Sequence, residues 1–101
     1  MQRTVLKEVY ELLRNIGAVA NEAEFSRDRL GRSESYARGL RFKGVGASTG
    51  SVAICASKLQ HYGLQMRDSS AHSELGKQFL ELCRECHNTI NEEAKARWLA
   101  A

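Results

Sequence analysis

Apolar residues recur at helical spacing near the start of the chain. Between Thr4 and Ile16 an apolar residue falls every three or four positions, which places one apolar stripe along a helix. The stripe consists of Val5, Val9, Leu12, Leu13 and Ile16. Gly17 follows at once, and a glycine at this position is a common end for a helix because it tolerates the left-handed conformation. The pattern therefore predicts a first helix that ends at Gly17.

Two short helices are predicted to follow, separated by a very tight turn. Asn21 is a good N-cap residue and Glu24 follows it three positions later, as in a capping box, so a helix is expected to run to Leu30 with Gly31 as its stop. Ser33 can then cap the next helix, over residues 34–42. Only one residue lies between the glycine stop and the serine cap, so the two helices must cross at a steep angle.

Two longer helices complete the predicted set. Ser48 or Ser51 is expected to cap the fourth helix, and Gly63 to terminate it. The apolar stripe of this helix is Val52, Cys55, Ala56, Leu59 and Tyr62. After a linker over residues 64–68, the pattern is helical from Ser69 and Ser70 to the end of the chain. The stripe of this last helix is Leu75, Phe79, Leu82, Cys83, Cys86, Ile90 and Ala94.

Composition favours an all-α fold of one domain in 101 residues, because proline is absent and good helix formers are abundant. The chain has no apolar run near 18 residues and reads into an amphipathic pattern from its start, so neither a membrane segment nor a signal peptide is expected. Three cysteines at apolar positions suit reduced thiols. The sequence therefore predicts a cytoplasmic protein without membrane contact.

The net charge of +3 is unevenly distributed. Residues 25–45 carry six basic and two acidic side chains, whereas residues 71–101 carry four basic and five acidic ones. A tight helix-helix turn on a basic surface is what a helix-turn-helix DNA reader needs. In that arrangement the second helix lies in the major groove, with Ala37 and Leu40 facing inward.

The outward residues of that helix supply candidate DNA contacts. Paired arginine donors can recognise guanine, serine is undiscriminating, and a carboxylate can accept from cytosine; the candidate base-contacting residues are Glu34, Ser35, Arg38 and Arg41. Neighbouring polar side chains can bind phosphate, which positions a protein without reading sequence. These phosphate candidates are Arg27, Arg29, Arg32, Ser33, Tyr36 and Lys43. The partner expected on these grounds is double-stranded DNA.

The string Leu30 to Tyr36, LGRSESY, followed by Leu40, resembles the turn of lambda-repressor-like (Cro/repressor, XRE-type) helix-turn-helix domains. Residues 47–59 are similar to the fourth helix of that family, with alanine in place of its usual proline. The resemblance covers roughly residues 4–63. It implies a five-helix-like domain whose base-contacting positions fall on Glu34, Ser35 and Arg38. The segment Phe25–Leu30 is one residue longer than the family's usual one. The whole chain also resembles a group of short uncharacterised alphaproteobacterial proteins, which implies no particular activity.

Together these observations divide the chain into a DNA-binding unit over residues 1–63 and a C-terminal helix over residues 69–101. Either part of this long helix packs on the domain and part extends, or the helix pairs with a second copy and braces the dimer. Its candidate dimer-interface residues are Leu75, Phe79, Leu82, Cys86, Ile90 and Trp98. The expected function is transcriptional regulation by a homodimer that occupies an operator. The alternative is a helical protein-binding adaptor or antiactivator that uses the same helix, with Trp98 and Leu99 as anchors.

The string Cys83-Arg84-Glu85-Cys86-His87 matches the C-x-x-C-H pattern of covalent haem attachment. That chemistry normally accompanies export, and the apolar stripe already accounts for both cysteines. A zinc site would join Cys83, Cys86 and His87 to Cys55 or His72, a set drawn from helices rather than from the loops usual for structural zinc. We expect neither cofactor nor metal, and metal analysis with a haem stain tests both. The residues suggest no enzymatic activity, because they form no nucleophile triad, paired-carboxylate pattern or phosphate-binding loop.

Overall fold

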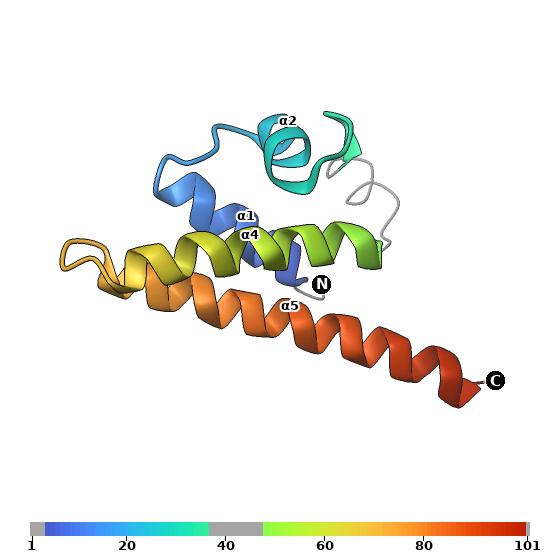
Figure 1. Ribbon diagram of the computed structural model, residues 1–101. Coiled ribbons are helices and arrows are strands. Elements are labelled where there is room, and N and C mark those ends of the chain that lie inside the picture. Colours follow the sequence, from blue (N-terminus) through green and yellow to red (C-terminus); the bar gives the residue numbers. More distant parts are fainter. Residues whose placement is uncertain (1–3, 37–47, 101) are drawn as a thin grey trace.

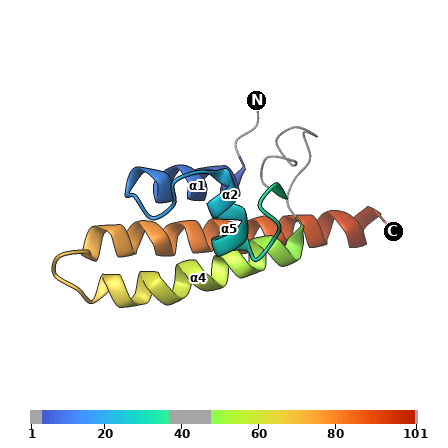
Figure 2. The same cartoon turned by 90° about the horizontal axis from the view of Figure 1, so that it is seen from above.

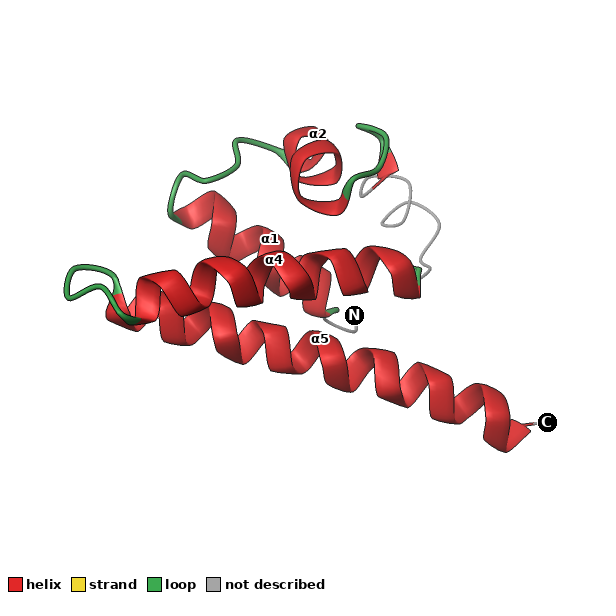
Figure 3. Cartoon of the chain, in the orientation of Figure 1, coloured by secondary structure: helices red, strands yellow, loops and turns green. Residues whose placement is uncertain are grey.

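The computed structural model describes residues 4–36 and 48–100. Within these ranges the chain forms helices joined by turns and has no strand, so the all-α prediction is confirmed. The elements are α1 (Val5–Asn15), α2 (Glu22–Glu24), η1 (Phe25–Arg29), α4 (Thr49–Arg67) and α5 (Ser73–Ala100). Helices α4 and α5 form an antiparallel hairpin (Figures 1 and 3). Seen from above, α1 runs alongside α5, and α2 with η1 lies over the hairpin (Figure 2).

Helix α1 begins and ends where its sequence signals predict. The Thr4 hydroxyl accepts from the Lys7 amide at 3.2 Å, which satisfies one of the free amides of the first turn. Gly17 adopts a φ of +79° just after the helix. Ile16, which belongs to the predicted stripe, is 43% exposed, whereas Leu6, which lies outside that stripe, is only 7% exposed. The stripe is thus rotated slightly from the one predicted.

The second helix forms its predicted cap. The Asn21 side chain accepts from the Glu24 amide at 2.9 Å, and the Glu24 carboxylate reaches back to accept from the Ala20 amide at 3.3 Å. Two amides at the start of the helix are therefore satisfied by side chains, as in a capping box. The carboxylate reaches the residue before the cap rather than the cap residue itself.

Beyond Glu24 this helix widens into the π-helix η1. The Leu30 amide donates to the Phe25 carbonyl, five residues back, and the Ser26 hydroxyl donates to the Glu22 carbonyl at 2.9 Å. Local serine bonds of this kind bend helices. A π turn holds one residue more than an α turn. The residue by which Phe25–Leu30 exceeds the usual helix-turn-helix segment is therefore taken up inside the helix.

Gly31 ends this helix as predicted, with a φ of +66°. The next amide, of Arg32, donates to the Ser26 carbonyl at 2.9 Å. In an α-helix that ends with a glycine at this position, the Arg32 amide would donate to the Arg27 carbonyl. The π turn thus shifts the partner of the closing bond by one residue and keeps the glycine stop in place.

Helix α4 starts at its predicted cap but does not end where predicted. Ser48 is the N-cap, with its hydroxyl accepting from the Ser51 amide at 3.2 Å. The prediction that Gly63 terminates the helix is wrong, because α4 continues to Arg67. The expected linker over residues 64–68 is therefore helical up to Arg67, and the connection to α5 is the short turn that precedes Ser73.

Gly63 is a packing residue rather than a helix stop. A Cβ at Gly63 would lie 3.0 Å from the Leu80 side chain, and one at Gly76 would lie 2.5 Å from the Arg67 backbone nitrogen and 2.9 Å from the Gly63 carbonyl oxygen. The two glycines therefore let the backbones of α4 and α5 come unusually close at the end of the hairpin. Tertiary packing here overrides the local tendency of glycine to end a helix.

One core joins α1, η1, α4 and α5. Its buried apolar side chains are Leu6, Val9, Leu13, Val19, Phe25, Leu30, Val52, Cys55, Ala56, Leu59, Phe79, Cys83 and Cys86. Helix α5, which was expected from about Ser69, begins at Ser73 and supplies three of these residues. The expected boundary at residue 63 thus lies inside α4, and α5 shares its core with the N-terminal elements.

Among the described helices, α5 alone has an end that projects from the rest. Thr49, the first residue of α4, donates through its hydroxyl to the Glu93 carboxylate at 3.1 Å. Beyond this point α5 extends past α4 (Figure 1), and Trp98 and Leu99 are 65% and 64% exposed. Most of the long helix therefore packs on its own chain, and about two turns remain uncovered.

Candidate nucleic-acid interface

Arg32, one residue after the glycine turn, ties that turn to the first turn of α4. Its Nε donates to the Ser51 hydroxyl at 2.8 Å, and a terminal nitrogen donates to the Ser48 hydroxyl at 2.9 Å. Its guanidinium also lies 5.3 Å from the centre of the Tyr36 ring, within the range of a cation–π contact. Arg32, expected to contact phosphate, thus makes three contacts within the chain.

Tyr36 forms a second tie to the same helix end. Its hydroxyl accepts from the Ser48 amide at 3.0 Å. Partial burial acts to raise the pKa of Tyr36, but hydrogen bonds with Ser48 and Ser51 and the charge of Arg32 lower it below its usual value. Tyr36 and Ser48 are therefore held together, although eleven residues separate them in the sequence.

Arg27 and Glu34 pair across the turn. A terminal nitrogen of Arg27 donates to the Glu34 carboxylate at 2.9 Å, and Nε of Arg27 donates to Asp28 at 2.9 Å. Hydrogen bonds with Asp28 and then Glu34 raise the pKa of Arg27 above its usual value. Glu34, expected to contact a base, is therefore engaged by a neighbouring arginine, in a solvent-exposed pair that salt can screen.

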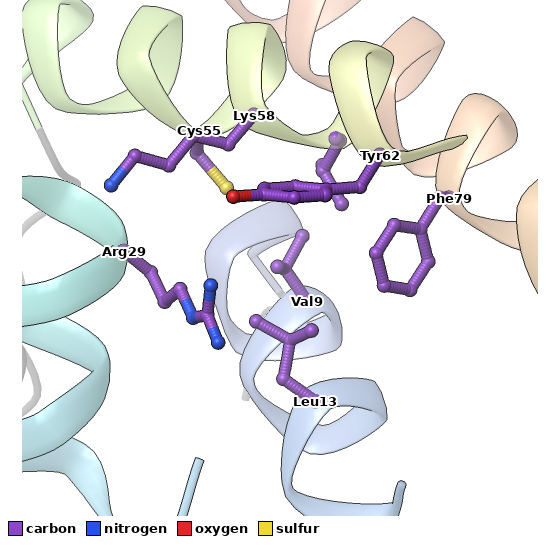
Figure 4. A pocket seen from close by; sticks show the side chains of 8 residues that line it. Val9, Leu13, Arg29, Cys55, Lys58, Tyr62 and Phe79 are labelled. Carbon is purple, nitrogen blue, oxygen red and sulfur yellow. The ribbon is translucent and has the colours of Figure 1, made fainter. Parts of the chain in front are cut away.

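Arg29 turns toward the body of the protein. A terminal nitrogen donates to the Ala18 carbonyl at 3.2 Å, while its buried Nε makes no hydrogen bond among the described residues. Beside it the Lys58 ammonium donates to the Asp28 carbonyl at 2.6 Å. These two cations border a small apolar notch of about 30 Å³ (Figure 4). The other residues that line the notch are Val9, Leu13, Cys55, Leu59, Tyr62 and Phe79.

The structure thus gathers the end of η1, the glycine turn and the start of α4 at one edge. Ser33 and Ser35 are exposed there. Arg38, Arg41 and Lys43, together with the inward positions Ala37 and Leu40, lie outside the described residues. The contact of Ser51 with Arg32 was not predicted, because serine at a helix start signals only a cap and carries no information about a partner nineteen residues away.

The C-x-x-C-H string does not present its residues on one surface. Cys83 and Cys86 are buried at 6% and 0% exposed, whereas His87 is exposed. In the part of the chain that the structure describes, no group of three or more His, Cys, Asp or Glu side chains is arranged to hold a metal ion. The two cysteines of the motif therefore lie in the core, whereas its histidine lies at the surface.

The candidate dimer residues fall into three groups. Phe79 and Cys86 are buried at 6% and 0% exposed in the core of their own chain, so they are not available to a partner and their assignment is wrong. Leu75, Leu82 and Ile90 are half-buried and pack against the same core. Only Trp98 is largely exposed. Helices α4 and α1 cover the stripe that was expected to pair with a second copy.

Among residues 4–36 and 48–100, no helix is both long and apolar enough to cross a membrane.

Comparison with known proteins identifies a family but no activity. Neither the curated proteins nor the solved structures contain a match to the chain. A family model described as a family of unknown function (DUF6626) matches residues 6–99, and the chain therefore belongs to that family.

Proposed function

We propose that this protein is a homodimeric DNA-binding regulator that reads DNA with the segment after Ser33. The observation that carries the proposal is the junction at Gly31. A capped helix ends in a left-handed glycine, and one residue later Arg32 fixes the turn to the start of α4. A rigid turn that presents the following segment is the main requirement of a helix-turn-helix.

The two residues that flank the proposed reading segment support the proposal. Tyr36 and Ser48 are joined by a hydrogen bond of 3.0 Å, so the described parts of the chain on either side of residues 37–47 are held together. Three of the six basic residues between positions 25 and 45 lie in this stretch, namely Arg38, Arg41 and Lys43. We assign Arg38 and Arg41 to base contacts and Lys43 to phosphate, and we assign contacts at the exposed edge of the turn to Ser33 and Ser35.

The side chains already engaged take structural roles in this proposal. Arg32 and Tyr36 hold the turn on α4, and Glu34 holds Arg27 in place across it. Arg27 is half exposed and can exchange its acidic partners for a phosphate. The reading surface is therefore smaller than the sequence suggested.

Replacing both Arg38 and Arg41 by alanine is expected to abolish sequence-specific binding. Each good arginine–guanine pair contributes about 1–3 kcal/mol of discrimination, so loss of two should weaken specific binding by at least roughly 30-fold. The binding site is first selected from a random duplex library. Affinity for the selected duplex is then measured by fluorescence anisotropy over a range of salt concentrations, because phosphate contacts make binding weaken steeply with salt.

The matched control removes two charges from α5 instead. Lys77 and Arg84 are 62% and 70% exposed and form only surface pairs in the described structure, so the Lys77→Ala/Arg84→Ala variant should bind the selected duplex nearly as the wild type does. Circular dichroism verifies that both variants fold. If the Arg38→Ala/Arg41→Ala variant still selects the same sequence, the assignment of the reading segment is wrong.

We assign the dimer contact to the projecting end of α5, because the rest of the stripe is covered. Trp98 is 65% exposed, and buried tryptophans commonly dominate interface energies. The wild type is expected to sediment as a dimer and the Trp98→Ala variant as a monomer with an unchanged helix content. Tyr62→Ala, which removes an aromatic ring that is 45% exposed on α4, should leave the dimer intact.

The same exposed end favours a second candidate function, a protein-binding adaptor. In that case Trp98 and Leu99 anchor a different protein, and the chain alone sediments as a monomer. A monomeric wild type that also selects no duplex from the library would favour the adaptor over the DNA-binding regulator.

A further inference from the structure

The notch between α1, η1 and the α4–α5 hairpin has an apolar floor and a polar rim. The rim consists of Arg29, Lys58 and Tyr62, whose side chains end in polar groups. The floor is formed by buried side chains that are each 6% exposed or less, namely Val9, Leu13, Cys55, Leu59 and Phe79. Apolar walls with a few polar groups on one side are typical of sites for small molecules.

Neither cation of the rim has an acidic partner in the part of the chain that the structure describes. Arg29 donates to the Ala18 carbonyl at 3.2 Å, and Lys58 donates to the Asp28 carbonyl at 2.6 Å. The Asp28 carboxylate is bonded to Arg27 instead, whose Nε donates to it at 2.9 Å. Two positive charges therefore border one notch, and each is held only by a neutral carbonyl.

Arg29 also carries a donor that lacks an acceptor. Its Nε is buried and makes no hydrogen bond among the described residues. Leaving a donor of a charged group buried without an acceptor costs free energy, so a ligand that supplies an acceptor oxygen gains affinity. The guanidinium extends from η1 toward Leu13 and Val9 on α1 (Figure 4), and a slight rotation would uncover Nε to a ligand in the notch.

The size of the notch limits what it can hold. Its volume of about 30 Å³ is about two to three times the space that one water molecule needs, so the floor has room for about two or three carbon atoms. A carboxylate at the end of such a tail would match the charges of the rim, because carboxylates form strong charge-assisted hydrogen bonds with guanidinium and ammonium groups.

We propose that this notch binds a short-chain carboxylate. The carboxylate group lies between Arg29 and Lys58 and accepts a hydrogen bond from the Arg29 Nε, and the tail rests on the apolar floor. The Tyr62 ring, which lies across the notch in Figure 4, covers the tail. An inorganic anion would satisfy the charges but leave the floor uncovered, and a long fatty acid would extend past the floor into solvent. Neither DNA binding nor dimerisation is needed for this site.

The test titrates the folded, isotope-labelled wild-type chain with sodium propionate at about pH 6, where carboxylates are ionised. Proton–nitrogen NMR follows the Nε–H signal of Arg29, assigned through its bonds to the Arg29 backbone, and this signal should shift and then saturate. A ligand of about five non-hydrogen atoms binds no more tightly than roughly micromolar, so the titration extends into the millimolar range.

Tail length and charge provide controls on the same wild-type chain. Affinity should rise about fourfold from acetate to propionate, the usual gain for one buried CH₂ group. It should not rise further from butyrate to hexanoate, because the longer tail exceeds the notch. Sodium chloride at the same concentration should give only a smaller shift that does not saturate.

Replacing Arg29 by lysine keeps the positive charge and removes the Nε donor. The Arg29→Lys variant should bind propionate at least about tenfold more weakly, because a hydrogen bond to a charged group is lost; backbone amide signals around the notch report its binding. Arg84→Lys is the matched control, since the Arg84 side chain is 70% exposed on α5, and it should bind propionate as the wild type does.

Any of four outcomes would overturn the proposal. The first is an equal, saturating shift with chloride, which would indicate a general anion site. The second is an affinity that keeps rising up to hexanoate, which would indicate an open apolar surface. The others are an Arg29 Nε–H signal that does not shift with propionate and an Arg29→Lys variant that binds propionate as the wild type does. The titrations of the wild type decide the question even where the Arg29→Lys variant folds poorly.

Discussion

Replacing Gly76 by alanine is expected to destabilise the protein by about 2–3 kcal/mol, the upper range for overpacking a core. The new Cβ would lie 2.5 Å from the Arg67 backbone nitrogen and 2.9 Å from its Cα. Backbone atoms cannot rotate away as a side chain can, so α4 and α5 must separate at their closest point. Chemical denaturation followed by circular dichroism measures the loss of stability.

Two other glycines provide a graded control on α4. A Cβ at Gly63 would meet the flexible side chain of Leu80 at 3.0 Å, and one at Gly50 would meet only the end of Arg32 at 3.9 Å. Gly50→Ala is expected to be neutral or to stabilise by up to about 1 kcal/mol, because alanine is the better helix former. Gly63→Ala should fall between the two. Equal effects at all three positions would contradict the close contact between the helices.

Replacing Phe25 by alanine is expected to cost about 3–5 kcal/mol, the usual range for a large buried aromatic side chain. Phe25 is 2% exposed, and its ring centre lies 5.4 Å from that of Tyr10, with the planes tilted by 55°. The lost ring leaves a cavity between η1 and α1. A domain of this size has a total stability of about 5–15 kcal/mol, so the variant should unfold far below the wild-type temperature.

Leu64→Ala serves as the control for this substitution. Leu64 is 39% exposed on α4, and truncation of such a surface residue usually changes stability by about 0.5 kcal/mol or less. Thermal unfolding of both variants, followed at the same protein concentration, separates the two effects. A Phe25→Ala variant as stable as Leu64→Ala would show that η1 does not rest on the core.

The starts of α1, α2 and α4 could be predicted from the sequence because their signals are local. Thr4, Asn21 and Ser48 each bond an amide within three residues, and the glycines that end α1 and η1 adopt positive φ. Gly63 carries the same local signal but faces a helix that is distant in the sequence. Only the packing of α4 against α5 distinguishes a glycine that stops a helix from one that lets another helix approach.

The candidate interface was predictable only in outline. The basic character and the tight turn follow from neighbouring residues, whereas the bonds of Arg32 to Ser48 and Ser51 join positions sixteen and nineteen apart. Phe79 and Cys86 show the same limit on α5. An apolar stripe predicts a buried face, but it does not reveal whether the cover comes from the same chain or from a second copy.

The π turn also explains a spacing of buried residues that an α-helix does not allow. Phe25 and Leu30 are five positions apart and are 2% and 0% exposed. On an α-helix, residues five apart point about 140° away from each other, so one of them would face solvent. In η1 the Leu30 amide bonds to the Phe25 carbonyl, and the two side chains align on one side. Deleting one residue between them would place them four positions apart, about 40° from each other on an α-helix, so the shortened segment should form a regular α-helix and keep both side chains on the core side.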